Sequence, residues 1–143
     1  MKEESKKKKG FKEIEERLRE LHSFKELDYK EFCDEGGLAD KIVQNAKELK
    51  MTQLRKFFNE IKAISRKISR KPNDPFDFAQ VAKLLPVLVY SVGRGLIPKE
   101  FYQKVLKICL RKEILQTNED FLRLADFLEA IIAYHKYHYP RGG

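Results

Sequence analysis

Hydrophobic residues recur at helical spacing along most of the chain. The most regular example lies between residues 51 and 71, where one apolar stripe follows the i, i+3, i+4, i+7 pattern of an amphipathic helix. Its members are Leu54, Phe57, Phe58, Ile61, Ile64 and Ile68. No stretch shows sustained alternation with a period of two, and no Asn-Gly or Asp-Gly hairpin signal occurs. The pattern predicts an all-α fold, a compact bundle of about five helices with short loops.

The N-terminal part divides into a lead-in and two helices. Residues 1–10, MKEESKKKKG, predict a disordered lysine-rich lead-in to a single helical-bundle domain over residues 11–139. Residues 11–32 predict a charged helix with Phe11, Ile14, Leu18, Leu21 and Lys25 on one side. Because this stripe is narrow, we expect the helix to dock on a second copy by exchange. A short helix over residues 38–49 follows the Gly36-Gly37 break.

Proline, glycine and capping residues set the next boundaries. Thr52 is the expected N-cap of the basic helix, which ends before Pro72. Asp74 as N-cap and Pro75 at the first position predict a further helix, FDFAQVAKLLPVLVYSV. This helix is apolar nearly all round, so we expect it to be the buried central one. Pro86 should kink or split it, and the glycines at 93 and 95 should end it.

Two more amphipathic helices complete the predicted bundle. The first opens at Pro98 and has an outer basic stripe of Lys104, Lys107 and Arg111. Its expected buried side consists of Phe101, Val105, Ile108 and Cys109. The last follows a turn and cap at residues 116–118, and its apolar positions are Phe121, Leu124, Ala125, Leu128, Ile131 and Ile132.

Positive charge is concentrated in the segment that carries the most regular stripe. Residues 51–72 hold seven Lys/Arg against Glu60 alone, which is +6 of the chain's net +8. On a helix, Arg55, Asn59, Lys62, Arg66 and Arg70 fall in an arc roughly 80° wide beside the apolar stripe and form a ridge about 22 Å long. A charged helix face is often only solvated, but such faces usually mix both signs, and acids are nearly absent here. The ridge therefore predicts contact with a nucleic-acid backbone.

Candidate RNA-binding residues follow from this ridge and from a second stripe. The primary set is Arg55, Lys56, Asn59, Lys62, Arg66, Lys67 and Arg70. The secondary set is Lys104, Lys107 and Arg111. Residues 98–117 carry five Lys/Arg against two acids, whereas residues 11–50 carry eight against eleven. This segregation favours head-to-tail self-association, although the same charges could serve solubility alone.

Enzymatic and metal-binding patterns are absent from the sequence. It contains no GxxxxGK[ST], GxSxG or HExxH motif, so we expect no catalytic residues and no cofactor. His135 and His138 have a usable spacing, but only His22 remains as another histidine, which disfavours a metal site. Cys33 and Cys109 lack metal-binding spacing and indicate reduced thiols. With no apolar run long enough to span a membrane and no signal-peptide core, we expect a cytoplasmic protein.

The C-terminal tail YHKYHYPR is rich in tyrosine. Tyr134, Tyr137 and Tyr139, beside Lys136 and Arg141, could stack on unpaired bases. Aromatic residues at the end of a bundle more often pack against it while their hydroxyls reach water, and we favour that interpretation.

The segment TQLRKFFNEI, residues 52–61, resembles the signature of the small subunit of type III-A CRISPR effector complexes, the Csm small-subunit family. The resemblance extends over roughly residues 38–138. It includes the apolar stretch FAQVAKLLPVLVYSVGRG, a helix near Lys99 and the ending FLEAIIAYHKYH.

This resemblance implies a non-catalytic helical subunit, present in several copies, that lines the duplex of crRNA and target RNA beside other Csm subunits. The motif itself makes Arg55 and Lys56 candidates for contact with the RNA backbone. The alternative is an autonomous helical DNA-binding or adaptor protein. A helix-turn-helix reader needs a tight turn and a polar recognition helix. The proline-broken, apolar residues after position 71 weigh against that alternative.

Overall fold

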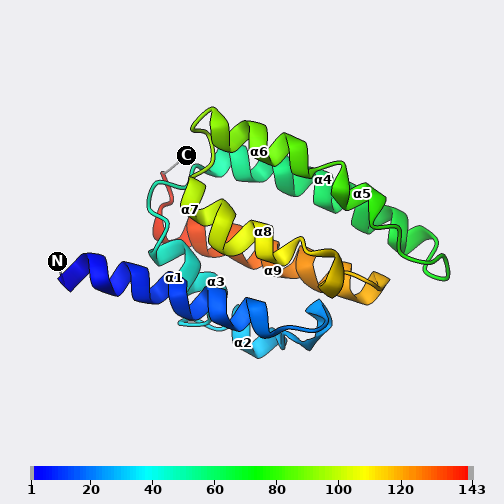
Figure 1. The fold of residues 1–143 in the computed structure, drawn as a ribbon, viewed down its shortest axis with the longest axis horizontal. Coiled ribbons are helices and arrows are strands. Elements are labelled where there is room, and N and C mark those ends of the chain that lie inside the picture. Colours follow the sequence, from blue (N-terminus) through cyan, green and yellow to red (C-terminus); the bar gives the residue numbers. More distant parts are fainter. Residues whose placement is uncertain (1, 142–143) are drawn as a thin grey trace.

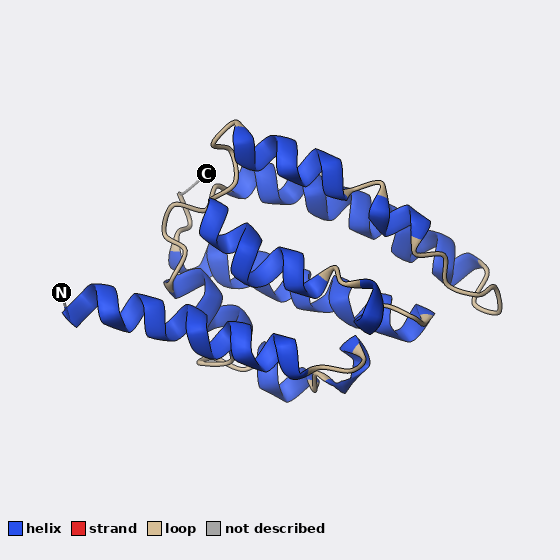
Figure 2. Ribbon diagram, in the orientation of Figure 1, coloured by secondary structure: helices blue, strands red, loops and turns tan. Residues whose placement is uncertain are grey.

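The computed structural model describes residues 2–141, with side chains from Phe11 onward. The side chains of residues 2–10 lie outside that description, as do residues 1 and 142–143, so the expected disordered lead-in over residues 1–10 stays a prediction. The described part contains helices and loops and no strand, which confirms the all-α fold (Figure 2). Its elements are α1 (Lys2–Glu20), η1 (Phe24–Glu26), α2 (Tyr29–Cys33), α3 (Leu38–Gln44), α4 (Met51–Arg70), α5 (Ala79–Ala82), α6 (Leu85–Gly93), α7 (Lys99–Phe101), η2 (Tyr102–Leu106), α8 (Lys107–Cys109), η3 (Lys112–Ile114) and α9 (Asn118–His138).

The helices form three layers (Figure 1). The helices α4, α5 and α6 make one outer layer, α7, α8 and α9 make the middle, and α1, α2 and α3 make the other outer layer. The long α9 packs against α3, α4 and η1. Its Phe127 meets two phenylalanines of the N-terminal region, with ring centroids 5.8 Å from Phe24 and 5.4 Å from Phe32. The last helix is therefore the central one.

The apolar segment expected to be central lies instead in an outer layer, so that expectation is wrong. It buries Val81 and Leu88, while Val87 and Tyr90 are 60% and 63% exposed. A helix can bury its whole circumference only if neighbours surround it, and the middle-layer position belongs to α9. The break at Pro86 is confirmed, because α5 ends at Ala82 and the proline lies in the first turn of α6.

The predicted start of this segment at Asp74 and Pro75 is also wrong. The ring of Phe76 stacks on Phe121 of α9, with centroids 5.5 Å apart, and helix formation begins only at Ala79. Asp77, not Asp74, accepts a hydrogen bond from the Ala79 N–H at 3.0 Å. The predicted end is confirmed, since α6 stops at Gly93 and Gly95 has a φ of +74°.

The continuous helix predicted over residues 11–32 ends at Glu20, and the chain continues through η1 into α2. The Ser23 hydroxyl and the Lys25 N–H donate to Asp120 of α9, so a long-range contact stabilises the break. The stripe Phe11, Ile14, Leu18 and Leu21 is buried in its own bundle. This burial removes the basis for the expected exchange with a second chain.

Other predicted boundaries hold with small shifts. The helix α3 begins at Leu38, as predicted, but gives way to turns after Gln44. Lys50, rather than Thr52, is the N-cap of α4, and the helix ends at Arg70, before Pro72. Thr117 caps α9, within the turn and cap predicted at residues 116–118. The helix that opens after Pro98 is continuous to Cys109 but includes a π-helical stretch, η2.

Asp120 is the most connected buried polar group in this fold. Its side chain is 1% exposed, one oxygen accepts from Ser23 and Lys25, and the other accepts from the Gln116 and Thr117 N–H groups at 3.2 and 3.1 Å. Thr117 Oγ1 in turn accepts from the Asp120 N–H at 3.1 Å, which completes a capping box. Burial opposes ionisation of this carboxyl, but these hydrogen bonds outweigh burial and lower the pKa of Asp120.

We predict that Asp120→Asn lowers the free energy of unfolding by about 2–4 kcal/mol, because the side chain keeps only one acceptor oxygen for buried donors and the capping box is weakened. The pKa of Asp120 is lowered in the folded state, so its contribution is complete above the unfolded value of about 3.9. The contribution is lost as the pH falls below that value toward the folded pKa. Urea unfolding at neutral and acidic pH measures both effects.

The matched control for this measurement is Glu119→Gln, since Glu119 occupies the same helical turn but is exposed. It should change stability by less than about 0.5 kcal/mol. Equal losses in the two variants would contradict the assigned role of Asp120.

Candidate nucleic-acid interface

The helix α4 has one buried and one exposed face, as its periodicity predicts. The buried residues are Met51, Leu54, Phe57, Phe58, Ile61, Ile64 and Ile68. The exposed residues include all seven primary candidates, Arg55, Lys56, Asn59, Lys62, Arg66, Lys67 and Arg70. The apolar stripe packs on α9 and toward α5 and α6, and the candidates remain on the surface.

Among the side chains that the structure describes, the cations of α4 lie within ion-pair distance of no carboxylate. Within residues 11–141, no ion pair involves Arg55, Lys56, Lys62, Arg66, Lys67 or Arg70. Their recorded contacts are weak: Lys62 Nζ lies 5.4 Å from the centroid of the Phe58 ring, and Arg70 Nε donates to the Arg66 carbonyl at 3.4 Å. This face therefore presents uncompensated positive charge to a ligand.

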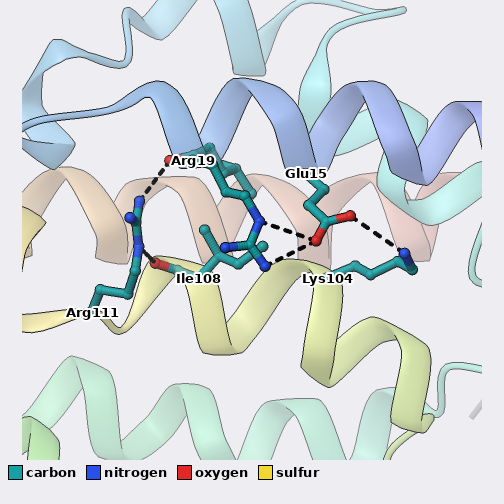
Figure 3. Close-up of polar contacts among 6 residues, drawn as sticks. Glu15, Arg19, Lys104, Ile108 and Arg111 are labelled. Atoms are coloured by element: carbon teal, nitrogen blue, oxygen red, sulfur yellow. Dashed lines mark hydrogen bonds and ion pairs between the residues drawn. The ribbon is translucent and has the colours of Figure 1, made fainter.

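The secondary candidates lie in a different layer and are partly engaged within the chain. Lys104 Nζ is 3.3 Å from Glu15 Oε1, and the other Glu15 oxygen accepts from Arg19 (Figure 3). Arg111 donates to the carbonyls of Leu18 and Ile108, both at 2.9 Å. Lys107 is exposed.

These contacts bear on the self-association that we expected from the separation of positive and negative segments along the chain. The positive segment 98–117 packs on α1 of the same chain, where Lys104 pairs with Glu15, so this lysine is already engaged within the chain. Burial opposes ionisation of Glu15, but hydrogen bonds from Arg19 and Lys104 outweigh burial and lower its pKa. The fold thus separates two stripes that look alike in the sequence: Lys104 and Arg111 of one are bonded within the chain, and the cations of the other form no ion pair within residues 11–141.

The start of α4 lies beside the end of α9 and forms a groove with it. The groove contains four cations and an amide: Arg55, Lys56, Asn59, Lys136 and Arg141. Sequence reasoning treated Lys136 and Arg141 only as neighbours of the tail tyrosines and did not place them with α4. The available signal was the cluster of basic residues at the end of the last helix, but the sequence does not show which helix lies opposite.

The tail itself is packed on the bundle. The Tyr134 hydroxyl donates to the Cys33 carbonyl at 2.5 Å, and the Tyr139 ring lies 5.2 Å from that of His135. Tyr137 is 67% exposed. The packing interpretation is therefore confirmed for Tyr134 and Tyr139, while Tyr137 is free to contact a ligand.

The two tail histidines bind different protein groups. His135 Nε2 is 2.8 Å from the Leu49 carbonyl, and His138 Nε2 is 2.5 Å from Asp40 Oδ1. Asp40 also accepts from the Gly36 N–H and from Gln44. These bonds and the contact with His138 lower the pKa of Asp40, although burial opposes this shift.

Among the residues that the structure describes, no cluster of three His, Cys, Asp or Glu could hold a metal ion. In the same part of the chain, no helix has the length and apolarity of a membrane span.

Comparison with protein families gives one match. The model of the family described as Csm2 Type III-A matches residues 26–141, which is most of the chain and includes all of α4 and α9. No curated protein and no solved structure gives a significant match.

Proposed function

The chain belongs to the type III-A Csm2 family and is thus a subunit of a type III-A CRISPR complex, and on this premise we propose that it binds the RNA backbone. In this proposal it is a non-catalytic structural subunit, and several copies line the duplex of crRNA and target RNA. Its other partners are the further subunits of the complex.

The observation that carries this proposal is the basic face of α4, whose cations form no ion pair within residues 11–141. The helix is 20 residues long, and its exposed cations, from Arg55 to Arg70, extend over about 22 Å at about 1.5 Å per residue. Point charges spaced along a rod suit a phosphate backbone and carry no information about base sequence. In a guide-directed complex, base pairing reads the sequence, so a subunit of this kind needs to recognise only charge and shape.

The alternative, an autonomous DNA-binding or adaptor module, has less support. A helix-turn-helix reader places a second helix after a tight turn and projects its first residues into the major groove. Here residues 71–78 are not helical, and the next helix, α5, spans only Ala79–Ala82. The segment after α4 thus lacks the geometry of a recognition helix.

We predict weak, sequence-tolerant RNA binding by the free protein that depends steeply on salt. Replacing Arg55, Lys62, Arg66 and Arg70 with Ala should weaken binding to all sequences alike, because phosphate contacts release counterions. At about 0.7 per phosphate contact on a single strand, the slope of log affinity against log salt should flatten by up to about three. Fluorescence anisotropy with labelled single-stranded RNAs of several sequences measures both quantities.

The control removes four exposed cations elsewhere: Lys12, Lys30, Lys47 and Lys112 to Ala. It changes net charge equally but leaves α4 intact, so its slope should stay close to that of the unmodified protein. An unchanged slope in the α4 variant would exclude the ridge from RNA binding. A loss of affinity that differs between RNA sequences would instead indicate that these side chains contact the bases.

The outer face of α6 supports a protein contact. Val87, Val89 and Tyr90 are 60%, 52% and 63% exposed, which is costly for a short helix unless a partner covers it. In the proposal, a neighbouring subunit of the complex covers this face.

We predict that Val87→Gln with Tyr90→Gln reduces incorporation into the reconstituted complex at least fivefold, because the contact loses apolar area. The stability and RNA affinity of the free protein should not change, since both side chains are exposed and lie outside α4. Lys30→Gln with Lys47→Gln is the control pair. Full incorporation of the α6 variant would exclude this face as a subunit contact.

A further inference from the structure

The groove between the start of α4 and the end of α9 differs from the other grooves along α4 in its charge. It has a volume of about 540 Å³, and neither Asp nor Glu lines it. Two of its cations, Arg55 and Lys56, come from α4, and two others, Lys136 and Arg141, come from the end of the chain. Four positive charges thus converge on one concave surface from segments far apart in the sequence.

The remaining grooves beside α4 mix both signs of charge. In the groove between α4 and the middle of α9, Lys62, Arg66 and Arg70 share the lining with Asp126 and Glu129. The groove at the C-terminal end of α4 likewise contains two aspartates, Asp74 and Asp77. A carboxylate in the wall repels a phosphate and offsets the attraction of a neighbouring cation. The attraction for phosphate is therefore strongest at the start of α4.

Several bonds hold the tail side of this groove in place. Lys136 Nζ donates to the Pro140 carbonyl at 2.8 Å, and the Tyr139 N–H donates to the His135 carbonyl at 2.8 Å. His138 bonds to Asp40 of α3. The end of α9 and the turn that carries Arg141 are therefore attached to the bundle, so Arg141 is positioned beside α4.

The groove is also lined by polar side chains, among them His135 and Asn59. His135 is 2% exposed and lies in the wall, and its Nε2 must donate to the Leu49 carbonyl, which can only accept. Its Nδ1 is buried and has no hydrogen-bond partner among the described residues. The Asn59 amide at the rim can donate as well as accept. Because Nδ1 of His135 is buried, the Asn59 amide is the polar group of these two that an RNA strand could reach.

We propose that this groove is the main phosphate-binding part of the RNA interface, and that Lys136 and Arg141 bind consecutive phosphates of one strand together with Arg55 and Lys56. This inference rests on the proposed function and extends it in two ways. It adds residues of the C-terminal tail to the interface. It also assigns the start of α4 a larger contribution to phosphate binding than the rest of the ridge.

The test measures binding of a labelled single-stranded RNA of mixed sequence over a range of salt concentrations. Lys136→Gln with Arg141→Gln should lower affinity at least fivefold and flatten the salt slope by about 1.4, at about 0.7 per phosphate contact. The control pair, Lys12→Gln with Lys30→Gln, removes the same charge from α1 and α2 and should change the slope by less than about 0.5. Arg66→Gln with Arg70→Gln, on the wall that faces carboxylates, should have an intermediate effect.

A pair of substitutions that keeps both positive charges distinguishes the effect of charge from the effect of a changed tail structure. Lys136→Arg with Arg141→Lys should bind RNA nearly as well as the unmodified protein. If this pair loses as much affinity as the Gln pair, or if the Gln pair loses no more than the control pair, the groove is not the phosphate site. RNA binding that still depends on α4 would then leave the proposed function intact, whereas no salt-dependent binding by the unmodified protein would overturn both.

Discussion

The buried carboxylate of Asp120 connects three parts of the chain on which the arrangement of the bundle depends. It completes the capping box of α9 by accepting from the Thr117 N–H, it accepts from Ser23 and Lys25 at the break after α1, and it accepts from the Gln116 N–H in the connection before α9. A buried charge is tolerated only when its hydrogen-bonding capacity is filled, and here both oxygens are occupied. Because α9 contacts α3, α4 and η1, fixing its first turn also sets the position of both outer layers. The opposite end of the same helix carries Lys136, so the candidate groove depends on this anchor as well.

Local signals were sufficient to predict the features that depend on one segment alone. The all-α fold, the buried stripe of α4, the break at Pro86 and the cap at Thr117 each follow from periodicity or from a single residue's backbone preference. The features that sequence reasoning missed depend on contacts between distant segments. The helix over residues 11–32 is interrupted because Asp120 binds the turn, and residues 75–78 stay out of a helix while Phe76 stacks on Phe121. Neither partner can be identified from the sequence around the break.

The same limit explains why the candidate site was only partly predictable. The stripe of Lys104, Lys107 and Arg111 and the ridge of α4 have similar spacing. In the first, Lys104 pairs with Glu15 of α1, whereas no Asp or Glu lines the groove at the start of α4. Which cations remain free is decided by the neighbour, and the neighbour is set by topology. For that reason, Lys136 and Arg141 could not be joined to Arg55 and Lys56 before the ends of α4 and α9 were seen side by side. The primary candidates were found because a helix with one buried stripe must expose the opposite face.

In the proposed function, the outer layer has two surfaces with different roles. Contacts between cations and phosphates are insensitive to sequence, so a basic α4 face bound to RNA would not fix the position of the subunit along the strand. Apolar contacts between proteins depend on shape and require a matching partner surface. The exposed side chains of Val87 and Tyr90 lie on α6, in the same layer as α4. A neighbour bound at α6 would therefore fix the spacing and orientation of α4, and the weak contacts of each subunit would then add along the strand as a multivalent interaction.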